Sequence, residues 1–132
     1  MRSVIYNYLK TLSFQSFTLS DKIPWEDNKG PLYEHNKKHI YVGVATVEQS
    51  PLIDTFSQAG TVDEITTLSV YFVNDAKQLP ADYDSTVVMI KEARLATGTE
   101  GYIQRTCQVT PSFIDDNLLT EFAFSFRKLL TN

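Results

Sequence analysis

The sequence predicts an α+β fold: a four-stranded, mainly antiparallel sheet with two helices on one face, in the order α-β-β-α-β-β. The strongest observation lies in residues 118–130, where Phe122, Phe124 and Phe126 occupy every second position. Successive side chains of a strand point to opposite faces, so the three rings would line one face of a strand. On a helix they would be spread around the axis. We therefore expect a central strand whose phenylalanine row forms one wall of the core.

Two other segments repeat apolar residues at spacings of three and four, which is typical of helices with one buried face. In residues 2–12 these are Val4, Ile5, Tyr8, Leu9 and Leu12. Residues 79–96 show the same pattern with Tyr83, Val87, Met89 and Ile90. In this second segment Pro80 suits a first turn, and Asp82 and Asp84 lie where the helix dipole favours carboxylates.

Three further segments alternate apolar and polar residues as strands do, and we expect strands over 38–48, 64–74 and 101–110. Pro111 and the acidic corner after it would turn the chain into the phenylalanine strand. In 101–110, Cys107 and Val109 would share one side, and Tyr102 would lie on the other. With both helices on one side of the sheet, the opposite side would be exposed to solvent or form a subunit contact.

The composition is that of one ordinary globular domain covering residues 1–132, with 42% apolar residues and a net charge of −4. Basic residues do not cluster, which argues against a nucleic-acid binder. A single cysteine excludes an intrachain disulfide framework and fits a reducing compartment. No apolar run approaches the roughly 20 residues that span a bilayer. We expect a soluble intracellular protein without a signal peptide.

Two irregular segments contain large apolar side chains, which are unusual in loops. Residues 13–36 include the only tryptophan and two prolines, and the connection near residues 49–63 is rich in Ser, Gln and Gly. Their apolar side chains either pack on their own domain or contact a neighbouring subunit, since aromatic anchors are enriched at interfaces. The candidate interface residues are Trp25, Leu32, Tyr33, Leu52, Ile53 and Phe56.

No catalytic, cofactor or metal site is expected. His35 and His39 are four residues apart, but across the start of a strand this spacing separates side chains by about 13 Å. Cys107 lacks a neighbouring base in the sequence, so we interpret it as a small buried apolar residue. Asp115 and Asp116 belong to a turn-forming sequence. We therefore predict that the protein is not an enzyme.

The sequence resembles the tail terminator proteins of long-tailed bacteriophages in the order of four segments that cover most of the chain. They are an N-terminal helix followed by Pro24-Trp25 and Pro31-Leu32-Tyr33, the strand region 40–54, the strand-turn-helix region 70–94, and the closing strand FAFSFRKLL after RTCQVTPSF. None of these segments is an enzymatic motif. The small head–tail joining proteins are a less close resemblance.

The resemblance implies a structural protein of the virion tail, assembled in the host cytoplasm. Such proteins form a homohexameric ring that caps the tail tube, ends its polymerisation and provides the surface for head attachment. The implied partners are other copies of the chain, the major tail tube protein and a head completion or connector protein. DNA would pass through the channel without specific binding, and neither a cofactor nor a membrane is implied.

Three alternatives stay open at this point. The chain could be a head-side connector or completion protein, or a small intracellular adaptor that binds a protein on the polar face of its sheet. It could also be an enzyme that uses a histidine, Asp115 or Asp116. A ring needs two different surface patches that meet on adjacent subunits, and the two apolar irregular segments are the expected patches.

Overall fold

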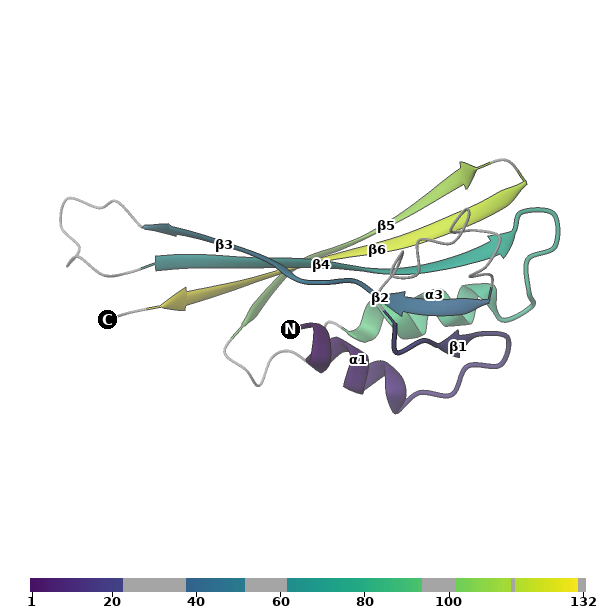
Figure 1. Ribbon diagram of the computed structural model, residues 1–132, viewed down its shortest axis with the longest axis horizontal. Coiled ribbons are helices and arrows are strands. Elements are labelled where there is room, and N and C mark those ends of the chain that lie inside the picture. The colour runs from purple at the N-terminus through teal and green to yellow at the C-terminus, as the bar shows by residue number, and fades with distance from the viewer. Residues whose placement is uncertain (23–37, 52–61, 94–101, 115, 131–132) are drawn as a thin grey trace.

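A computed structural model describes residues 1–22, 38–51, 62–93, 102–114 and 116–130 (Figure 1). This part of the chain is an α+β fold with two helices and an open, six-stranded mixed sheet, which confirms the predicted fold class. The elements in chain order are α1 (Arg2–Lys10), β1 (Thr18–Leu19), β2 (His39–Val42), β3 (Thr46–Pro51), β4 (Val62–Asp75), α3 (Tyr83–Lys91), β5 (Ile103–Ile114) and β6 (Asn117–Leu130).

The sheet is built around its two longest strands, β4 and β6, which pair antiparallel along their whole length. The strand order is β1-β2-β4-β6-β5, and β3 pairs with the part of β4 that β2 does not reach. All pairs are antiparallel except the short pair of β1 and β2, which is parallel. Figure 1 shows β3 and the adjoining ends of β4 and β6 extending beyond both helices. We call this three-stranded extension the arm.

The prediction of four strands was wrong because one expected strand divides in two and a short strand is added. Residues 38–48 form β2 and the start of β3, separated by residues 43–45. Val42 pairs with Val70 and Thr46 with Thr67, so four steps along this chain match three steps along β4. One extra residue on one side of a ladder produces such a bulge. The added strand is β1, which two backbone hydrogen bonds hold to β2.

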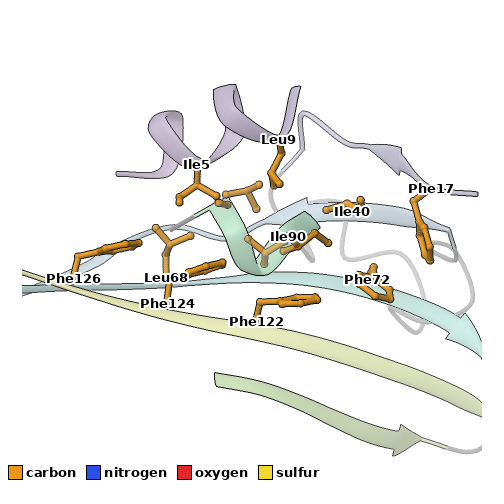
Figure 2. Close-up of a cluster of buried hydrophobic side chains, with 13 residues drawn as sticks. Ile5, Leu9, Phe17, Ile40, Leu68, Phe72, Ile90, Phe122, Phe124 and Phe126 are labelled. Atoms are coloured by element: carbon orange, nitrogen blue, oxygen red, sulfur yellow. The ribbon is translucent and has the colours of Figure 1, made fainter. Parts of the chain in front are cut away.

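The phenylalanine row forms the wall of the core as predicted. Phe122, Phe124 and Phe126 are buried, and both helices lie against this face of the sheet (Figure 2). Ile5 and Leu9 from α1 and Ile90 from α3 reach the same cluster. Phe72 on β4 contacts three other rings, and the distances between ring centroids are 4.7 Å to Phe17, 5.6 Å to Phe122 and 5.7 Å to Tyr83.

Strand β5 differs from the prediction at both ends. It continues through Pro111 to Ile114 instead of ending before the proline. Its pairing with β6 shifts by one residue between Gln104 and Thr106. Because one extra residue inverts the alternation of side chains, Tyr102 lies on the core side, where its ring approaches Phe126 at 6.5 Å. The sequence pattern had placed Tyr102 on the opposite side.

Candidate interaction surface

The face of the sheet opposite the helices has no covering element in the described part of the chain. On β4 this open face includes Thr67 and Ser69, and on β6 it includes Ala123 and Ser125. These four side chains are small, whereas the residues that alternate with them on β6 are the buried phenylalanines. The sheet is therefore bulky on its helix side and thin on its open side.

The small residues leave a hollow of about 440 Å³ across the middle of the open face. It extends over the three strands β4, β6 and β5, together with residues 43 and 44, which follow β2, and the start of β3. Its lining residues are Gly43, Val44, Thr46, Thr67, Leu68, Ser69, Tyr71, Thr106, Gln108, Ala123, Phe124 and Ser125. Six of the lining side chains carry a hydroxyl group and Gln108 carries an amide, although most of the exposed surface is apolar. The hollow can therefore receive an apolar group and also donate and accept hydrogen bonds.

Gly43 shapes one side of the hollow because the chain passes close to β4 there. Its backbone N–H donates to the carbonyl of Ser69 at 2.8 Å. A Cβ atom at this position would lie 2.9 Å from the same carbonyl oxygen, which is closer than real Cβ atoms come. A glycine is therefore the residue that lets β2 lie against β4 just before the chain bulges into β3.

Three charged residues on the open face, Asp63, Glu121 and Arg127, form hydrogen bonds within the chain. The Ser69 hydroxyl donates to a carboxylate oxygen of Glu121 at 3.0 Å. Arg127 donates from Nε to Asp63 at 2.7 Å, and this hydrogen bond with the nearby negative charge raises the pKa of Arg127. The Asp63 side chain is only 17% exposed, and that of Arg127 is 41% exposed. None of the residues that line the hollow is charged.

The arm has its own polar contacts on the helix side of the sheet, beyond the helices. Glu64 accepts hydrogen bonds from the Gln49 amide at 2.8 Å and from the Tyr102 hydroxyl at 3.2 Å. The ammonium group of Lys128 lies 5.2 Å from the centre of the Tyr102 ring, a cation–π distance. Val47, on the same side of the arm, is 54% exposed.

Large apolar side chains are also exposed at the opposite end of the sheet. Phe113, near the turn between β5 and β6, is 72% exposed, and Ile114 beside it is 39% exposed. The turn itself is tied to the end of β4, since the Ala76 N–H donates to the Asp116 carbonyl at 2.8 Å. Exposed apolar groups at both ends of a sheet are the kind of feature that a subunit contact covers.

The six predicted interface residues, Trp25, Leu32, Tyr33, Leu52, Ile53 and Phe56, all lie outside the described residues. His35 and Asp115 also lie outside them. His39 is half-buried on β2 with its ring 6.1 Å from that of Tyr41, and exposed Asp116 forms an ion pair with Lys77 at 3.8 Å. Cys107 is half-buried and packs against the core. Of the candidate residues, the structure therefore describes His39, Cys107 and Asp116, which lie on β2, on β5 and after β5.

Sequence reasoning missed the hollow, although a signal for it was present. Thr67 and Ser69, like Ala123 and Ser125, are small residues two positions apart on predicted strands. If two such rows lie on adjacent strands and on the same face, their small side chains leave a depression on that face of the sheet. Which rows become neighbours depends on register, which the sequence pattern left open.

Within the described ranges, no group of three or more His, Cys, Asp or Glu residues is placed to hold a metal ion. The helices that the structure describes are too short and too polar to cross a membrane. In comparisons with known proteins, no family model matches this sequence, and no curated protein matches it significantly. The fold defines a class, an α+β protein, and in the described ranges its helices cover one face of the sheet.

Proposed function

We propose that this chain is a structural subunit of a bacteriophage tail, a tail terminator that forms a ring, caps the tail tube and presents a surface to the head. The observation that carries the proposal is the uncovered face of a sheet longer than the helices that pack on it. In the described part of the chain this face has a hollow at its centre and exposed apolar residues near both ends. The order of sequence segments described above supports the same role.

A ring requires that one patch of each subunit meets a different patch of the next. The hollow and the exposed apolar residues of the β5–β6 turn, Phe113 and Ile114, lie at different places on the sheet. They are therefore suited to a head-to-tail contact. The proposed partners are further copies of the chain, the tube protein and a head completion or connector protein, and the proposed role is not enzymatic.

The test is to measure the mass of the purified protein by native mass spectrometry and sedimentation, alone and with tail tubes. A tail terminator should form a discrete closed oligomer, and its addition should end the growth of tubes. A protein that stays monomeric and never binds tube ends would contradict the proposal. Binding to completed heads instead of tube ends would assign the chain to the head-side connectors.

A variant on the open face locates the contact. Ala123→Arg places a long charged side chain in the hollow and should reduce ring formation while the protein stays folded. Asn7→Arg makes the same change on the exposed side of α1 and should leave assembly unaffected. If both variants assemble like the wild type, the open face is not the subunit contact.

A peptide-binding adaptor is the second candidate, because the hollow lies open at the surface and has hydroxyl and amide groups along its lining. Such groups can bond the backbone of an extended peptide. This function predicts a monomer that binds one soluble host protein. It also predicts that Ala123→Arg abolishes that binding and has no effect on the protein's mass.

A further inference from the structure

Two prolines lie inside strands of the described sheet. Pro51 is the last residue of β3, and Pro111 lies within β5. Proline has no backbone N–H, so it fits a strand only where that group would face away from the neighbouring strand. The directions of the backbone groups along the sheet therefore show whether each proline replaces an N–H that would face a neighbouring strand or one that would face the outer edge.

Successive backbone groups of β4 face its two neighbours alternately, as in any antiparallel sheet. The Gly43 N–H donates to the carbonyl of Ser69, so the odd-numbered residues of β4 face β2 and β3. Directly after the strand, the Ala76 N–H donates to the carbonyl of Asp116. The even-numbered residues of β4 therefore face β6, and the two hydrogen bonds give one consistent pattern.

This pattern orients Pro51 on β3. Thr46, Glu48 and Ser50 pair with odd-numbered residues of β4 and therefore direct their backbone groups toward β4. Their neighbours Val47, Gln49 and Pro51 direct theirs to the outer edge. The hydrogen-bond donor that Pro51 lacks would have belonged to this edge and not to the ladder with β4.

The same reasoning orients Pro111 at the other side of the sheet. Even-numbered residues of β6 face β4, so the odd-numbered residues Leu119 and Glu121 face β5. Their partners are Ser112 and Thr110. Pro111 lies between these two partners, so its missing N–H belongs to the outer edge of β5. Both strand prolines of the described sheet thus interrupt an outer edge.

We propose that Pro51 and Pro111 guard the two long edges of the sheet, and that they prevent it from growing by the addition of a strand from another copy of the chain. Natural sheets blunt their edges with prolines, bulges and short edge strands. Here β5 also has a register shift between Gln104 and Thr106, and the edge strand β1 has only two residues. The proposal does not depend on the proposed tail function.

The edges need guarding because they carry exposed apolar side chains. Val47 on β3 is 54% exposed, and Phe113 on β5 is 72% exposed. A long strand edge with exposed apolar residues is a template for pairing with another chain. With both edges blocked, copies of the chain cannot join by continuous strand pairing, whatever other surface they use.

The experiment restores the missing donors with Pro51→Thr, Pro111→Thr and the double substitution. The control is Pro80→Ala, because Pro80 precedes α3 and contributes only its carbonyl, which accepts from the Tyr83 N–H. Mass is measured by sedimentation over a range of concentrations, with thioflavin T fluorescence as a probe of extended sheet. The single variants are analysed alongside, so a double variant that fails to fold does not end the test.

We expect the proline-to-threonine variants to gain mass with concentration, by roughly twofold or more in the double variant, and to bind thioflavin T. Wild type and Pro80→Ala should show neither change. Folded variants that keep the wild-type mass at all concentrations would overturn the proposal.

Amide hydrogen exchange in dilute Pro111→Thr tests the geometry separately. The new N–H at position 111 should exchange as fast as that of exposed Phe113, whereas the N–H of Gln108, directed toward β6, should be protected. If the N–H at position 111 were as protected as that of Gln108, the backbone of this residue would face β6. Pro111 could then not protect the outer edge, and the proposal would be overturned.

Discussion

Gly43 and Ser69 lie against each other where β2 leaves the side of β4, with 2.8 Å between the glycine N–H nitrogen and the serine carbonyl oxygen. One residue later in register the chain bulges and continues as β3. This contact therefore joins the part of the sheet that is covered by helices to the arm that extends beyond them. It also sets the direction of the backbone groups along β4 and forms one side of the hollow.

The first prediction is that Gly43→Ala destabilises the protein by about 1–3 kcal/mol, the usual cost of forcing an extra methyl group into a well-packed place. The added Cβ would lie 2.9 Å from the Ser69 carbonyl oxygen, so β2 must move away from β4. Urea unfolding measures the change. Val44→Ala, at a side chain that is 61% exposed, is the neighbouring control and should change stability little. Equal stability of both variants would contradict the close contact.

The second prediction compares the loss of stability when a buried phenylalanine and an exposed phenylalanine are replaced by alanine. Phe122 is fully buried, so Phe122→Ala should cost about 3–5 kcal/mol of unfolding free energy. Phe113 is 72% exposed, so Phe113→Ala should stay within about 0.5 kcal/mol of the wild type. Thermal and urea unfolding provide the measurements. A large loss for Phe113→Ala would mean that this side chain is buried in solution.

The third prediction tests the backbone directions in β5 by inserting new prolines. Gln108→Pro removes an N–H that faces β6 and leaves a ladder carbonyl without its donor, which should cost about 1–3 kcal/mol. Phe113→Pro removes an N–H that faces the outer edge, so stability should change by about 0.5 kcal/mol or less. Both side chains are exposed.

Alanine at each of these positions is the reference, so that loss of the side chain is measured separately from loss of the N–H. If both prolines destabilise the protein equally relative to alanine, the alternation of inward and outward groups along β5 is wrong.

The fourth prediction concerns Asp82, which precedes α3 and connects this helix to the segment before β1. Its carboxylate accepts hydrogen bonds from the Ser16 N–H at 3.0 Å and the Thr86 hydroxyl at 3.4 Å. Hydrogen bonding from the Ser16 side chain, followed by that from its backbone and from Thr86, lowers the pKa of Asp82 below its ordinary value of 3.8. The charged form therefore stabilises the folded state.

Because the folded-state pKa is the lower one, this contribution is complete above pH 3.8 and is lost as the pH falls below that value through the folded pKa. Asp82→Asn should therefore be less stable than the wild type at neutral pH, and the difference should shrink in acid. Urea unfolding at a series of pH values measures it. A difference that is the same at all pH values would assign the effect to the amide and not to the charge.

The core was predictable because a strand with one buried face has apolar residues at every second position of its sequence. Phe122, Phe124 and Phe126 alternate with small or charged residues, and one face of the strand must then be apolar whatever its neighbours are. The helix faces that contain Ile5, Leu9 and Ile90 were predictable for the same reason. Each of these patterns is local, so it does not depend on which elements meet.

The bulge after Gly43, the shift near Gln104 and the place of Pro111 were not predictable in this way. A bulge inverts the alternation of side chains without changing the composition of the strand, as the position of Tyr102 shows. A proline in a sequence predicts the end of a strand, unless it is known that its missing N–H would face the outer edge of the sheet. Edges exist only after the strands have taken their order in the sheet.

The sequence by itself determined the fold class, both helices and the phenylalanine wall of this protein, because local periodicity decides which side of each element avoids water. The tertiary structure alone decided that small residues of neighbouring strands meet in a hollow on the open face, and that both strand prolines lie on outer edges. These features depend on register between segments far apart in the chain, and register is set by pairing and packing of whole strands, not by any one segment.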